Sequence, residues 1–197
     1  MSRKWPSWYT GDPNADPNIV LGDIFEKAAS FNTGLGISYP LNPLNHVLAT
    51  DFSGVAAGSR PPDVELTMPG TGRKVRFQDI THNHAKFWVV VLTGEIATTR
   101  PLLLELQSFV EHSQRLKNHD SLGWITISAS TGCSTYEALG MEPFGATYFD
   151  AQFAAHEKLG LRLENGGIVI LRPDGLVGSG GFIDGQWVEN YFLAVLR

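Results

Sequence analysis

The chain has 197 residues, of which 43% are hydrophobic and 18% are charged, as in an ordinary globular protein rather than a disordered one. Its formal net charge of -5 disfavours nucleic acid and anionic membranes as partners, because both bind basic surfaces. The single cysteine, Cys133, excludes an intramolecular disulfide, a Cys-x-x-Cys redox pair and a cysteine-rich zinc site. No apolar run approaches the roughly 18 residues of a membrane helix, and the first residues lack the apolar stretch of a signal peptide. We therefore expect a cytoplasmic protein.

The first part of the chain, residues 1–72, is predicted to be an arm with three aromatic residues, a helix and an extended segment. Asp16-Pro17 is typical of a helix start, and apolar residues at helical spacing predict a helix over residues 18–32. The Gly- and Pro-rich stretch that follows predicts extended chain, with short strands at residues 64–67 and 74–77.

The second part, residues 73–197, shows a regular alternation of strand and helix patterns. Strands are predicted at continuous apolar runs, and helices where apolar residues recur every three or four positions. The predicted order is a strand at 87–92, a helix at 99–117, a strand at 124–128, a helix at 151–159, a strand at 167–171, a turn at 172–176 with a returning strand, and a helix at 186–196. This β-α-β-α-β-β-α order predicts the α/β class and a thioredoxin-like fold, a mixed sheet flanked by helices.

The redox chemistry of that fold is not encoded in this sequence. Thioredoxin-like oxidoreductases place a Cys-x-x-Cys pair at the start of the helix after the first strand, where the helix lowers the pKa of the thiol. Residues 92–100 occupy that position and contain no cysteine, so exchange through such a pair is excluded. Cys133 is interpreted as a loop thiol, because no activating base lies beside it in the sequence.

Cofactor and metal motifs are also incomplete. None of the Gly-rich stretches completes a G-x-G-x-x-G pattern between a strand and a helix, so no flavin or nicotinamide site is expected. His82 and His84 would share one face of an extended chain, but zinc needs at least one more ligand. Asp79, His46 or His156 could supply it only through the fold, so we expect no metal and no cofactor.

Several segments resemble a known family. Residues 58–64 read Gly-Ser-Arg-Pro-Pro-Asp-Val, and residues 171–178 read Leu-Arg-Pro-Asp-Gly-Leu-Val-Gly. Between them stand Tyr148-Phe149-Asp150 and His156. Together these segments resemble the C-terminal dimerisation domain of flavin-dependent phenol hydroxylases (phenol 2-monooxygenases), and the resemblance covers residues 18–197.

The resemblance implies a thioredoxin-like domain that lacks the redox cysteines and does not itself hold the flavin. The FAD-binding and substrate regions of the family are missing from these 197 residues, so a free-standing domain is expected. We therefore expect a non-catalytic dimerisation or accessory module of aromatic or phenolic metabolism. Its expected partners are a second copy of itself or a flavin monooxygenase, and neither nucleic acid nor membrane.

An alternative hypothesis is a small cofactor-independent enzyme of secondary metabolism. It would be an isomerase, cyclase or dehydratase that binds a small aromatic ligand, such as a phenolic or quinone polyketide-type substrate. General acid–base chemistry and polarisation of a phenol or quinone oxygen would require titratable side chains around the substrate. The candidate residues are His82, His84, Asp79, Tyr148, Asp150 and His156. Asp150 is more simply interpreted as the cap of the helix that follows it.

Overall fold

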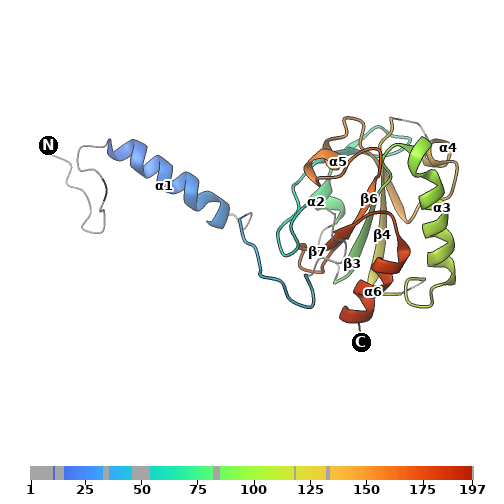
Figure 1. The fold of residues 1–197 in the computed structure, drawn as a ribbon. Coiled ribbons are helices and arrows are strands. Elements are labelled where there is room, and N and C mark those ends of the chain that lie inside the picture. Colours follow the sequence, from blue (N-terminus) through green and yellow to red (C-terminus); the bar gives the residue numbers. More distant parts are fainter. Residues whose placement is uncertain are drawn as a thin grey trace. The chain divides into compact units, whose positions relative to one another are not determined.

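The computed structural model describes residues 11, 16–32, 36–45, 54–81, 85–117, 119–131 and 134–196. The chain divides into two compact units, residues 1–37 and 38–197 (Figure 1). In the first unit, helix α1 (Pro17–Asn32) confirms the helix predicted from the sequence. The backbone N–H of Asn18 donates to Oδ1 of Asp16 at 2.8 Å, as expected for a residue that caps a helix. None of the described helices is long and apolar enough to cross a membrane.

The second unit is built on a seven-stranded mixed sheet with the order β2-β1-β5-β4-β3-β6-β7. Strands β3, β4 and β5 run parallel, and the remaining neighbours pair antiparallel. The strands are β1 (Glu65–Thr67), β2 (Lys74–Arg76), β3 (Phe87–Leu92), β4 (Leu122–Ser128), β5 (Ala146–Phe149), β6 (Gly167–Leu171) and β7 (Val177–Gly181). The β3-α3-β4 crossover and the β6–β7 hairpin confirm the central order predicted from the sequence.

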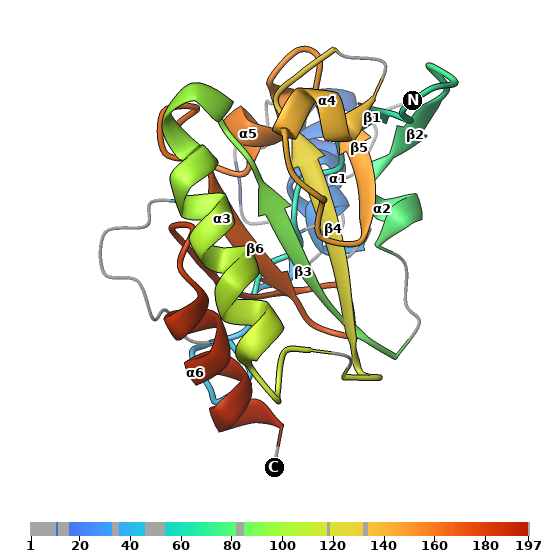
Figure 2. The ribbon, with the colours of Figure 1, turned by 90° about the vertical axis from the view of Figure 1, so that its right-hand side faces the viewer.

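Helices cover both faces of this sheet. They are α2 (Phe77–Ile80), α3 (Ile96–His112), α4 (Thr135–Leu139), α5 (Ala154–Lys158) and α6 (Gly185–Val195). Helices α3 and α6 lie side by side on one face (Figure 2). The protein therefore has two hydrophobic cores, one on each face of the sheet. Val89 and Val91 of β3 pack into the core on the α3 and α6 side. Val90 and Leu92 pack into the core on the opposite face, which includes Ala155 of α5. This alternation explains the unbroken apolar run of β3, since both of its faces are buried.

Helix α3 differs at both ends from the predicted range of 99–117. It begins earlier because the carbonyl oxygen of Glu95 already accepts bonds from the amides of Thr98 and Thr99, each at 3.0 Å. It ends at His112 because Ser113 turns the backbone into an extended conformation. The Oγ of Ser113 then accepts from the amide of Leu116 at 3.1 Å, so the residues that follow form a turn.

The hairpin between β6 and β7 has the turn that its sequence predicts. The amide of Arg172 donates to the carbonyl oxygen of Leu176 at 2.8 Å, and the amide of Gly175 donates to the carbonyl oxygen of Arg172 at 2.9 Å. Gly175 has φ +79°, a conformation that glycine adopts without strain.

Candidate functional site

The carboxyl ends of β3, β4 and β5 meet around a buried histidine, which is where an α/β sheet most often places its functional groups. His156 of α5 has 0% of its surface exposed. Its Nδ1 lies 2.8 Å from Oδ2 of Asp150, and its Nε2 accepts the backbone N–H of Gly94 at 3.1 Å. Because a backbone N–H can only donate, Nε2 must be the unprotonated nitrogen, and the proton on Nδ1 is donated to Asp150.

Asp150 is the centre of this arrangement. The same Oδ2 atom also accepts the amides of Ala155 at 2.9 Å and of His156 at 3.1 Å, both in the first turn of α5. The Asp150 carboxylate thus stabilises the start of that helix, but it is not the N-cap that the sequence predicted, because α5 begins at Ala154 rather than at residue 151 and Phe153 occupies the N-cap position. Both members of the Asp150–His156 pair are only 1% exposed, so neither side chain reaches a solvent-filled hollow.

Further hydrogen bonds connect the loop after β3 to the loop before β6. The amide of Glu95 donates to the carbonyl oxygen of Leu163 at 2.6 Å, and Oγ1 of Thr98 donates to the carbonyl oxygen of Glu164 at 2.9 Å. Gly94 has φ +63°, and a Cβ at that position would overlap backbone atoms of Leu163 and Gly166. We refer to this set of contacts, together with the Gly94–His156 bond, as the β3–β6 joint.

The β3–β6 joint occupies the position where a thioredoxin-like oxidoreductase carries its reactive cysteines. Here Gly94 and Glu95 stand at the start of α3, and their amides bond to His156 and Leu163 instead of facing a substrate. A side chain at Gly94 would overlap the backbone of Leu163 and Gly166, so the start of α3 is closed at that position.

The structure describes two of the other four predicted site residues, Tyr148 and Asp79. Tyr148 of β5 is half-buried against the core cluster on the α5 side, and burial raises the pKa of its hydroxyl. Asp79 is exposed on α2. His82 and His84 lie outside the described residues, as does Cys133. Within the described ranges, no three His, Cys, Asp or Glu side chains gather as metal ligands would. Sequence reasoning missed Gly94, whose only signal was a glycine soon after a buried strand.

Comparisons with known proteins show the fold and nothing finer. No family model matches the chain, and no curated protein matches it. A peroxiredoxin-like protein from Aquifex aeolicus aligns with a TM-score of 0.52 at 12% identity, over 72% of this chain and 88% of that one. A thiol peroxidase from Chromobacterium violaceum aligns with a TM-score of 0.50 at 15% identity, over 71% of this chain and 87% of that one. The thioredoxin domain of a thiol-disulfide oxidoreductase from Bacteroides vulgatus aligns with a TM-score of 0.50 at 13% identity, over 70% of this chain and 98% of that one.

These likenesses confirm the thioredoxin-like fold that the order of elements predicted. At such low identity they carry no activity over to this chain. Nothing in the comparisons links the chain to phenol hydroxylases.

Proposed function

We propose that this protein is a non-catalytic thioredoxin-like module that self-associates, with α1 as the contact element. The observation that carries the proposal is the apolar sequence of α1, whose large side chains are not buried within the first unit: Ile19 is 65% exposed, Leu21 49% and Phe25 61%. A helix with apolar residues on several sides is normally buried against other elements. We expect such a helix to bind an apolar surface, and we take a second copy of the chain as the partner that supplies it.

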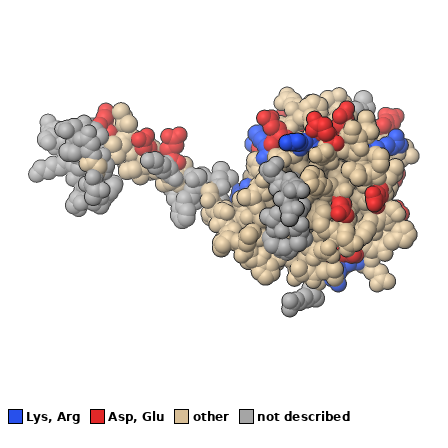
Figure 3. All heavy atoms as spheres, in the orientation of Figure 1, with Lys and Arg blue, Asp and Glu red and all other residues tan. Residues whose placement is uncertain are grey.

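The β3–β6 joint supports a structural use of the fold. An exchange enzyme of this fold needs an open thiol at the start of α3, whereas Gly94 is enclosed by the backbone of residues 163–166. The surface also suits association, because much of the visible face of the second unit is uncharged, with many charged side chains along its upper edge and others on its right side and at the bottom (Figure 3). Acidic side chains stand among uncharged ones on α1 in the same view.

The finer part of the proposal is a role in aromatic or phenolic metabolism, with a flavin monooxygenase as a second partner. It rests on the two segments that carry the resemblance, residues 58–64 and 171–178. These segments bond to each other: the amide of Gly58 donates to the carbonyl oxygen of Val177 at 2.7 Å, and the amide of Val177 donates to the carbonyl oxygen of Ser59 at 2.8 Å. Because residues 58–64 and 171–178 contact each other, their combined resemblance to the phenol hydroxylase domain is more specific than the resemblance of either segment alone.

The test is sedimentation velocity over a range of protein concentrations. We expect the unaltered protein to dimerise, and the double variant Leu21→Ser, Phe25→Ser to dissociate at least about tenfold more readily because it loses the apolar contact. The matched control is Leu41→Ser, Leu193→Ser, which alters residues of the second unit that are 69% and 49% exposed. A protein that stays monomeric at every concentration would overturn the proposal, as would equal weakening by both double variants.

A further inference from the structure

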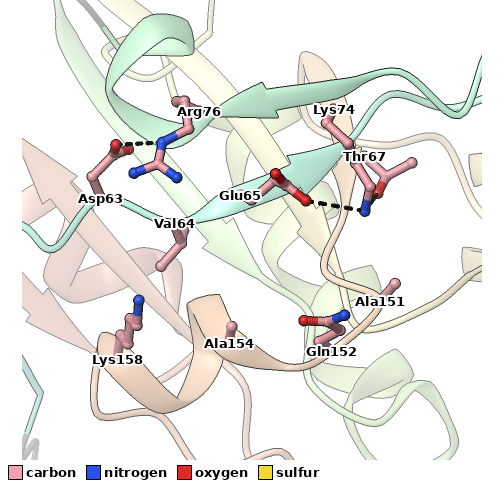
Figure 4. A pocket seen from close by; sticks show the side chains of 10 residues that line it. All are labelled: Asp63, Val64, Glu65, Thr67, Lys74, Arg76, Ala151, Gln152, Ala154 and Lys158. Atoms are coloured by element: carbon pink, nitrogen blue, oxygen red, sulfur yellow. Dashed lines mark hydrogen bonds and ion pairs between the residues drawn. The ribbon is translucent and has the colours of Figure 1, made fainter.

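A charged hollow lies beside the β1–β2 hairpin, facing α5 (Figure 4). Its volume is about 210 Å³, and its walls come from β1, β2, the loop after β5, and α5. Five of its lining side chains are charged: Asp63, Glu65, Lys74, Arg76 and Lys158.

The two carboxylates of this hollow already have cationic partners. Oδ2 of Asp63 accepts from Nε of Arg76 at 2.7 Å, and its Oδ1 accepts from the amide of Gln78 at 3.1 Å. Oε1 of Glu65 lies 3.4 Å from Nζ of Lys74. Each carboxylate is thereby matched by one cation across the hairpin.

Lys158 is the third cation of the hollow, and no lining carboxylate is left to match it. Its ammonium group points into the hollow from α5, while the guanidinium of Arg76 points inward from the opposite wall (Figure 4). Three cations against two carboxylates leave one positive charge in the hollow. This local excess stands out in a protein whose formal net charge is -5. An anion placed between Lys158 and Arg76 is therefore electrostatically favoured.

A second hollow of about 230 Å³ adjoins the first, because both are lined by Thr67 and Ala151. Its other walls include Met68, the largely buried Phe149 and the glycine-rich turn of the hairpin. No charged side chain lines it. A charged end and an apolar end thus meet at Ala151.

We propose that these two hollows form one groove that binds a small amphipathic carboxylate. The carboxylate group would lie between Lys158 and the two terminal nitrogens of Arg76, which can donate to both of its oxygens. The apolar body of the ligand would lie against Met68 and Phe149. The groove contains no residue of α1 or of the β3–β6 joint. A test of ligand binding in the groove is therefore separate from the test of self-association.

Benzoate is the probe for this groove, and binding is followed by chemical-shift changes in amide NMR spectra of the full chain. We expect saturable shifts centred on residues 63–76 and 149–158, with millimolar affinity because the cations are exposed. Benzyl alcohol, which has the same ring and no charge, should bind at least about threefold more weakly. Lys158→Gln should weaken benzoate about three- to fivefold, whereas Lys117→Gln, at an exposed lysine on the turn after α3, should leave it unchanged.

A second variant tests the junction of the two hollows. Ala151→Leu adds a side chain where they meet, so it should weaken benzoate and benzyl alcohol alike. Equal affinity of benzoate and benzyl alcohol for the unaltered protein would overturn the proposal. So would shifts that fall outside the groove, or a Lys158→Gln protein that binds benzoate as tightly as the Lys117→Gln control.

Discussion

The backbone amide of Gly94 donates a hydrogen bond to Nε2 of His156 across 62 positions of sequence. This bond joins the loop after β3 to α5, and through His156 it connects to the Asp150 carboxylate. In a thioredoxin-like oxidoreductase the same loop presents a reactive thiol. The fold here uses that loop to hold two chain segments together, and the consequences can be measured.

His156→Ala should lower the free energy of unfolding by about 3 kcal/mol. The change removes the imidazole that bonds to both the Asp150 carboxylate and the Gly94 amide. Both groups stay buried and lose a hydrogen bond, which costs more free energy than removing all members of a polar network together. Urea unfolding measures the stability, and amide hydrogen exchange of Gly94 should become faster by a larger factor than that of the β4 amides. His112→Ala, at an exposed histidine near the end of α3, is the control and should change stability by less than about 0.5 kcal/mol. A His156→Ala protein as stable as this control would show that the network contributes nothing.

Gly94→Ala should destabilise the protein by about 2 kcal/mol more than Gly70→Ala does. Both glycines have positive φ, +63° and +72°, so each substitution carries a similar backbone strain. They differ in their surroundings, because a Cβ at Gly94 would overlap backbone atoms of Leu163 and Gly166, whereas a Cβ at Gly70 meets open space. Thermal unfolding of the two variants compares them directly. Equal losses of stability would mean that the loop can move aside and that the β3–β6 joint is not closed.

The sequence predicts the strands of the central sheet well, for a physical reason. Strands β3 and β6 are buried on both faces, and their long apolar runs reflect this. The turn between β6 and β7 is predicted as well, because Pro, Asp and Gly each favour its backbone conformation. Helices α2 and α4 were not predicted, since 4 and 5 residues are too few to show helical spacing, and the helix predicted over residues 151–159 is the shorter α5, Ala154–Lys158.

The site was only partly predictable. Asp150 and His156 were candidates, but the sequence placed Asp150 directly before the helix, whereas α5 begins at Ala154 and Asp150 accepts amides five and six positions further along the chain. The link to Gly94 is not local, because it depends on how β3 and α5 meet at the edge of the sheet. The pairing of β1 with β5 is likewise antiparallel and distant in sequence, so the groove beside the hairpin could not be foreseen.

Tyr191→Phe should change how stability depends on pH. The hydroxyl of Tyr191 donates to the carbonyl oxygen of Leu44 at 2.7 Å. Burial raises the pKa of Tyr191 well above its ordinary value of 10.0. The positive charge of Arg172 lowers this pKa in part, and the negative charge of Asp174 raises it further. The unfolded chain therefore ionises first, and the folded protein loses stability as the pH rises above about 10, by up to about 1.4 kcal/mol per pH unit. Below that pH the contribution is fully present.

The variant should accordingly be about 1 kcal/mol less stable than the unaltered protein at pH 7, through loss of the hydrogen bond, and the more stable of the two near pH 11. Urea unfolding at both pH values measures this crossover. Tyr136→Phe, at a tyrosine that is 57% exposed, should show no such crossover. Parallel curves for the unaltered protein and Tyr191→Phe would contradict the burial argument.

Two buried hydroxyls should respond to removal in opposite directions. Oγ1 of Thr126 accepts the amide of Phe144 and donates to the carbonyl oxygen of the same residue, both at 2.9 Å. Thr126→Val keeps the shape and leaves both backbone groups unpaired, so it should cost about 2 kcal/mol. Oγ of Ser179 in β7 is buried with no hydrogen-bond partner among the described residues. Ser179→Ala removes a polar atom that was buried without compensation, so it should raise stability by about 1 kcal/mol. Chemical unfolding of the two variants side by side measures both effects, and a loss of stability in Ser179→Ala would show that this hydroxyl makes a contact after all.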